Sequence, residues 1–132
     1  MMEVTIQAKD QVEEQDVADL LSCAFEGGIG HWAVIIGYKK PEVIFKWETF
    51  EGDDTIYRYV QYPMSEGGAV ILQDSEDSSE KWELTLDKVR SGLSVMANKY
   101  PRHYADFING NADAVTGDVF IQCALFGEVV FG

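Results

Sequence analysis

Two long segments of the chain carry apolar residues three and four positions apart, which is the spacing of one helical face. The first covers residues 17–25 and follows a run of acids that suit the positive end of a helix dipole. The second covers residues 86–100 and follows Thr85, a residue type that caps helix N-termini. We predict a helix over each segment, the first ended by Gly27 and Gly28, one of which supplies a left-handed C-cap.

The last third of the chain is predicted to continue as helix. Pro101 ends the preceding helix and starts a short one over residues 102–108. Asp113 is placed to cap a further helix that runs to Phe126 and is apolar on nearly every side, as in a helix central to a core or an interface. Gly127 ends this helix, and residues 128–131 are expected to form a short final strand.

The chain ends in an apolar segment. Residues 122–132 contain a single charge, Glu128. Ordering a chain end costs conformational entropy that burial has to recover, so apolar residues at this position indicate packing. We expect the segment to pack into the chain's own core or into a partner, a homodimer being one form of the second alternative.

Alternating apolar and polar residues, with turn residues between them, predict the strands. Residues 29–40 are ambiguous and could begin as a short helix that becomes a strand over 33–38. The other predicted strands cover residues 3–8, 43–50, 55–62, 69–73, 81–85 and 128–131. This order of elements predicts one α+β domain over residues 1–132. We expect an antiparallel sheet of about four to six strands with about three to four helices packed on it.

Net charge is the one extreme property of the composition. The 132 residues include 23 acidic and 10 basic residues, which gives a net charge of −13 at neutral pH. Such a field repels phosphate backbones and anionic membranes, so we expect no direct binding to nucleic acid and none to membranes. A basic protein surface is the partner class that this charge favours, although high acidity also serves solubility alone.

Two acidic clusters are the predicted partner-binding residues. They consist of Asp74, Glu76, Asp77 and Glu80 in one loop, and of Glu51, Asp53 and Asp54 in another. The first cluster has carboxylates two residues apart, as calcium loops do, but Ser79 stands where an EF-hand requires glycine. We therefore interpret this cluster as a solvated hairpin tip and predict no metal site.

A glycine-rich loop is the second candidate site. It contains Gly27, Gly28, Gly30, His31 and Trp32. Glycines allow close approach of a ligand, and the last two residues would add a titrating group and a flat stacking surface. The alternative is a helix-ending turn followed by a core tryptophan, because phosphate-binding glycines precede a helix whereas these follow one.

No residue pattern predicts catalysis or a cofactor. Three aspartates lie near the last predicted helix and could in principle act as acid and base. However, Asp113 is explained as a cap, and Asp118 as a first-turn acid or as a buried partner of an arginine, Arg102 or Arg90. Because the chain has neither a nucleophile elbow nor a zinc-ligand spacing, we predict that the protein is not an enzyme.

Cellular location is predicted from the N-terminus and the cysteines. The N-terminal residues show no basic segment followed by an apolar one, so we expect neither an export signal nor a membrane anchor. A cytoplasmic location follows as the expectation. In that compartment Cys23 and Cys123 are expected to be free buried thiols rather than a disulfide.

Residues 16–32 (DVADLLSCAFEGGIGHW) and 113–132 (DAVTGDVFIQCALFGEVVFG) resemble segments of a family of small, uncharacterised acidic proteins from phages and mobile elements. The likeness rests on the AFEGG motif with its following tryptophan and on the ALFGEVVFG end, whereas the middle of the chain is much looser. The resemblance implies a phage or mobile-element setting and, with it, the cytosol of a host cell. It carries over no catalytic residue.

Two functions follow as predictions. The first is a non-enzymatic acidic binding protein that covers the basic surface of a host or defence protein, as an inhibitor or a mimic of DNA. The second is a small-ligand module for a nucleotide-like molecule, built from the glycine-rich loop, the strand aromatics and a phosphate-binding residue such as Arg58. The net charge argues against the second function, because an acidic protein attracts anions poorly.

Overall fold

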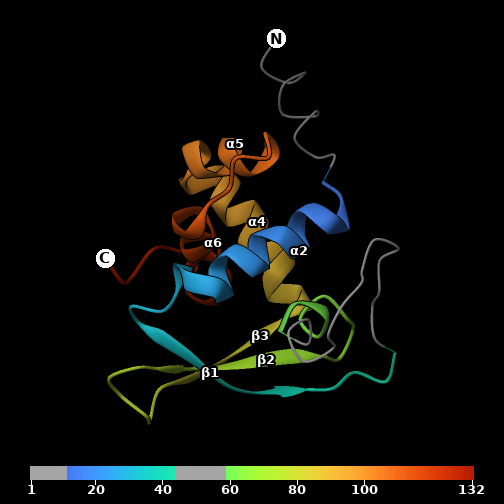
Figure 1. The fold of residues 1–132 in the computed structure, drawn as a ribbon, viewed down its shortest axis with the longest axis vertical. Coiled ribbons are helices and arrows are strands. Elements are labelled where there is room, and N and C mark those ends of the chain that lie inside the picture. Colours follow the sequence, from blue (N-terminus) through green and yellow to red (C-terminus); the bar gives the residue numbers. More distant parts are fainter. Residues whose placement is uncertain (1–11, 44–58) are drawn as a thin grey trace.

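The computed structural model describes residues 12–43 and 59–132, which form an antiparallel sheet with helices on one of its faces (Figure 1). In chain order the elements are α2 (Glu14–Cys23), the π-helix η1 (Ala24–Gly28), β1 (Ala33–Lys39), β2 (Ala69–Asp74), β3 (Lys81–Thr85), α4 (Leu86–Lys99), α5 (Pro101–Ile108) and α6 (Ala114–Phe126). The predicted α+β class and single domain are confirmed for this part of the chain.

The sheet is smaller than predicted. Its strand order is β1-β2-β3, and the central strand β2 runs antiparallel to both neighbours. Over the described residues the sheet has three strands rather than four to six, and five helices accompany it rather than three to four. The strand predicted over residues 3–8 and most of those predicted over 43–50 and 55–62 lie outside the described residues.

Residues 59–61 form a helical turn where the sequence predicted the end of a strand. Ser65 closes this turn from its C-terminal side: its hydroxyl donates to the carbonyl of Gln61 at 2.6 Å. The backbone N–H of Ser65 also donates to the carbonyl of Tyr62 at 3.1 Å. Carbonyl groups that are satisfied within a local turn do not join a sheet ladder, so the strand prediction is wrong here.

The C-terminal segment packs on its own domain, which is one of the two predicted alternatives, but it is not a strand. Val130 and Phe131 both donate their backbone N–H to Oε1 of Gln122, at 2.7 Å each. The N–H of Val129 donates to the hydroxyl of Tyr100 at 2.8 Å. These side-chain acceptors take the place of a neighbouring strand, and the strand predicted over residues 128–131 is therefore absent.

The predicted helix caps are confirmed at three positions and wrong at one. Thr85 and Asp113 each accept a hydrogen bond from the backbone of the following first turn, at 3.4 and 3.0 Å. Gly127 has the left-handed conformation expected of a C-cap, with φ of 76°. Gly27 has an extended φ of 177° and Gly28 has no positive φ either, so the left-handed C-cap predicted at one of the two is wrong.

The remaining glycines of this region serve close packing between η1 and α6. A Cβ atom at Gly28 would lie 2.4 Å from the carbonyl oxygen of Ala114. A Cβ atom at Gly117, on α6, would lie 2.5 Å from the backbone nitrogen of Ala24. No side chain fits at either distance, so the two backbones meet directly. This contact holds the loop after η1 over the N-terminal half of α6.

Helix α6 is the centre of the core. Its residues from Thr116 to Ala124 are buried apart from Asp118, as expected for a helix that is apolar on nearly every side. Cys123 lies in this stretch, and burial raises the pKa of its thiol to about 11. Cys23 is half-buried, and both cysteines are free thiols, as predicted.

Candidate functional site

The two sequence-predicted sites that the structure describes lie next to each other. The tip of the β2–β3 hairpin, residues 74–80, is joined to the loop after η1 by a hydrogen bond from the N–H of Ser75 to the carbonyl of Trp32, at 2.9 Å. Between them is a cleft of about 250 Å³, which we call the tip cleft. It is lined by His31, Trp32, Asp74, Ser75, Glu76, Asp77 and Phe131.

The hairpin tip is ordered by its own aspartates. Oδ1 of Asp74 accepts the N–H of Glu76 at 2.8 Å. Oδ1 of Asp77 accepts the hydroxyl of Ser79 at 2.6 Å and its N–H at 3.0 Å. These hydrogen bonds, the one from the hydroxyl first, hold the pKa of Asp77 below its usual range. The tip is thus a turn whose backbone is held by hydrogen bonds to the Asp74 and Asp77 carboxylates.

The carboxylates of the tip have no cationic partner among the described residues. Asp74, Glu76, Asp77 and Glu80 form the acidic cluster predicted from the sequence. Within the part of the chain that the structure describes, no lysine or arginine forms an ion pair with any of them. Charges that are neither paired nor buried retain their full attraction for a cation that approaches from outside.

Asp118 on α6 supports the loop side of the cleft. Its Oδ1 accepts the indole N–H of Trp32 at 2.7 Å and the side-chain N–H of Gln122 at 3.0 Å. Its Oδ2 lies 2.9 Å from Nε2 of His31. Both predicted roles of Asp118 are wrong, since it lies beyond the first turn of α6 and its partners are His31, Trp32 and Gln122 rather than an arginine. The contact between η1 and α6 brings the loop, and not an arginine, to this carboxylate.

Trp32 is a core residue. Its side chain is 3% exposed and stacks on Phe131 with ring centroids 4.7 Å apart and planes 5° apart. Trp82 packs against it edge-on at 5.7 Å. The prediction that Trp32 offers a ligand a flat stacking surface is therefore wrong, and the alternative of a core tryptophan is confirmed. His31, whose side chain is 45% exposed, is the member of the loop that faces solvent.

The chemistry of the tip cleft favours cationic groups. Three of its lining residues are carboxylates, and the only other titratable side chain of the lining is that of His31. An anionic phosphate would meet repulsion at this site, whereas an ammonium or guanidinium group would be attracted. Among the described residues, no group of three or more potential ligands is arranged to hold a metal ion.

A hydroxyl, an imidazole and a carboxylate also meet between α5 and α6. The hydroxyl of Thr116 lies 3.1 Å from Oδ1 of Asp113 and 3.4 Å from Nδ1 of His103. Thr116 is 1% exposed, so no substrate reaches its hydroxyl. In a catalytic triad the carboxylate orients the imidazole from the side away from the hydroxyl. Asp113 instead contacts the hydroxyl of Thr116. We interpret this cluster as part of the α6 N-cap.

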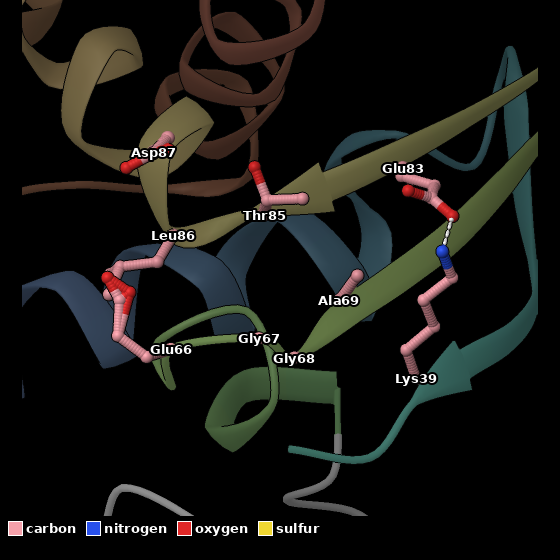
Figure 2. A pocket seen from close by; sticks show the side chains of 9 residues that line it. All are labelled: Lys39, Glu66, Gly67, Gly68, Ala69, Glu83, Thr85, Leu86 and Asp87. Atoms are coloured by element: carbon pink, nitrogen blue, oxygen red, sulfur yellow. Dashed lines mark ion pairs between the residues drawn. The ribbon is translucent and has the colours of Figure 1, made fainter. Parts of the chain in front are cut away.

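A second cleft, of about 320 Å³, lies at the end of the sheet (Figure 2). Its lysine is already paired, since Nζ of Lys39 lies 2.5 Å from Oε1 of Glu83 across β2. Glu66 and Asp87 line the other end of the cleft, as Figure 2 shows. Lys39 thus neutralises part of the negative charge of this cleft. The cleft therefore attracts a cation less strongly than the tip cleft does.

The second acidic cluster, Glu51, Asp53 and Asp54, lies outside the described residues, as does Arg58. No local pattern in the sequence indicates that Asp118 supports the tip cleft. Its partners His31 and Trp32 lie more than eighty residues away along the chain. For the same reason, no local pattern indicates that the hairpin tip lies next to the glycine-rich loop.

Comparisons of the chain with protein-family models, with curated proteins and with solved structures found no match. The likeness to phage and mobile-element proteins therefore stays a prediction. No helix within residues 12–43 and 59–132 is both long enough and apolar enough to cross a bilayer.

Proposed function

We propose that this chain is a non-enzymatic acidic binding protein of phage or mobile-element type that covers the basic surface of a host or defence protein. The observation that carries the proposal is the carboxylate cluster at the hairpin tip, Asp74, Glu76, Asp77 and Glu80, which has no cationic partner among the described residues. The partner supplies lysine or arginine side chains, and the tip cleft accepts one of them beside His31.

Rigidity distinguishes this cluster from an ordinary solvated loop. The Asp74 and Asp77 turns fix the course of the backbone, and the bond from Ser75 to Trp32 ties the tip to the core. A surface that is already ordered loses little conformational entropy on binding. Carboxylates on such a surface compete with phosphates for the same lysine and arginine groove, and the release of counterions drives both associations. Inhibition by mimicry of DNA is the form of binding that this arrangement supports.

A double variant tests the proposal. Neither Glu76 nor Glu80 accepts a side-chain hydrogen bond within the described residues, so Glu76→Gln with Glu80→Gln removes two charges and leaves the turns intact. The matched control is Glu26→Gln with Glu128→Gln, which gives the same net charge from two exposed glutamates elsewhere. Binding of a fluorescent oligolysine peptide is then measured by anisotropy at low and at physiological ionic strength.

The tip variant is expected to bind the peptide about tenfold more weakly at low ionic strength, and the control variant about twofold more weakly at most. Equal losses in the two variants would show that only net charge matters, and would leave solubility as the role of the acids. For a mimic of DNA, we expect the native chain to displace duplex DNA from a basic DNA-binding protein. The tip variant should displace less of the DNA.

A further inference from the structure

One cleft that the structure describes is mostly apolar and lies away from the hairpin tip. Its volume is about 540 Å³, and it lies between α2, α4 and the turn before β2. We call it the α2–α4 groove. Its apolar lining consists of Val12, Val17, Val43, Met64, Leu86, Val89 and Leu93. Val43 is 80% exposed, which is high for a valine beside a hydrophobic lining.

The spacing of the lining residues is that of a helix-packing seam. Leu86 and Leu93, both half-buried, lie on α4 on either side of Val89, which is 2% exposed, at intervals of three and four residues. A stripe with this spacing is the surface on which another helix packs its own residues at i, i+3, i+4 and i+7. Helix α2 contributes Val17 to the opposite wall. The groove thus has the form of a site for one additional helix.

The rim of the groove is acidic. Glu13 and Glu14 stand at the start of α2, and Glu66 stands on the opposite side. The one cation in the lining, Arg90, has its guanidinium 4.0 Å from Glu66 and 3.9 Å from Asp87, and its side chain is 65% exposed. Contacts of that length at the surface contribute little and leave most of the negative field in place.

We propose that the α2–α4 groove binds a basic amphipathic helix of the partner protein, with apolar side chains on the seam and lysine or arginine side chains at the glutamate rim. The inference rests on the proposed function in one respect, the basic character of the partner. It adds a second contact surface and a conformation for the bound segment. Apolar burial supplies affinity that salt does not remove, whereas the rim and the hairpin tip supply the part that salt screens.

The probe is a synthetic peptide of leucine and lysine, about four helical turns long, with every leucine on one face. The control peptide has the same composition, rearranged so that the leucines share no face. The native chain is expected to bind the one-faced peptide about tenfold more tightly than the rearranged one, because only a continuous apolar stripe can follow the seam. This preference is expected to persist at high ionic strength.

Matched variants locate the binding to the groove. Val12→Ser with Val43→Ser changes one half-buried and one exposed lining residue and none of the buried core residues. Val34→Ser with Val115→Ser changes two other exposed valines, 44% and 58% exposed, outside the groove. The groove variant is expected to lose the preference for the one-faced peptide, and the control variant to keep it. Circular dichroism confirms that each variant is folded.

Three results would overturn the inference. Equal binding of the two peptides would show that the bound segment is not recognised as an amphipathic helix. An unchanged preference in the groove variant would show that the peptide does not bind in the α2–α4 groove. Binding of the one-faced peptide only after deletion of residues 1–11 would assign the groove to the chain's own N-terminal segment. Failure of the proposed function looks different: the Glu76→Gln, Glu80→Gln variant would then match its charge control, whatever the leucine peptides do.

Discussion

Carboxylates take opposite roles at the two sides of the tip cleft. On the loop side, Asp118 is 15% exposed and receives hydrogen-bond donors from Trp32, Gln122 and His31. On the hairpin side, Glu76 and Glu80 are exposed and without a cationic partner among the described residues. The same chemical group therefore stabilises the fold on one side and is free for a partner on the other. Burial and the supply of donors decide which role it takes.

The largest effect is expected from Asp118→Ala. This substitution removes the acceptor of the indole N–H of Trp32 and one of the two acceptors of the Gln122 side-chain amide, in a mostly buried position. We expect the free energy of unfolding to fall by about 3 kcal/mol, as measured by urea denaturation. Asp87→Ala, at a carboxylate whose side chain is 91% exposed, is the control and should change stability little. A small effect of Asp118→Ala would mean that the carboxylate does not support the cleft.

Gln122→Leu is expected to have the next largest effect. The fully buried Gln122 side chain accepts from Val130 and Phe131 and donates to the carbonyl of Phe131. Its replacement should cost about 2 kcal/mol of stability. Hydrogen exchange should show the amides of Val130 and Phe131 losing protection before those of α6 do. Protection that persists in the variant would indicate that apolar packing alone holds the C-terminal segment.

The double substitution of Glu76 and Glu80 by glutamine should leave the fold unchanged. Both side chains are exposed and make no hydrogen bond that the structure describes, so the urea midpoint should equal that of the native chain. Only the affinity for the oligolysine peptide should fall. A clear loss of stability would contradict this expectation, because it would show that the exposed carboxylates also support the structure.

The smallest effect concerns the ionisation of Asp77. The hydroxyl of Ser79 is the largest cause of the lowered pKa of this carboxyl, so Ser79→Ala should raise the pKa toward its ordinary value. A carboxyl whose pKa is lowered by folding stabilises the native state above its unfolded pKa and loses that contribution as the pH falls through the folded value. Carbon-13 NMR titration of the Asp77 carboxyl measures the change. An unchanged midpoint would contradict the assignment of the cause to Ser79.

Much of the fold was predictable from local pattern. The Thr85 and Asp113 caps, the left-handed Gly127 and the hairpin of β2 and β3 all depend on residues close together in the chain. The strand predicted over residues 128–131 was wrong, because Gln122 supplies the acceptor that a strand would have supplied. The sequence predicts a left-handed helix cap at one of the two glycines of η1. Close contact with the backbone of α6 is instead what requires glycine at position 28.

Composition and short-range spacing in the amino-acid sequence are enough to give the acidity of this protein, the identity of its hairpin tip and the amphipathic character of α2 and α4. Three other features depend on tertiary packing: the burial of Trp32, the contact of Asp118 with His31, and the apolar groove between α2 and α4. Each of these joins residues far apart in the chain. Such contacts depend on how helices and sheet pack together, and no local pattern encodes that packing.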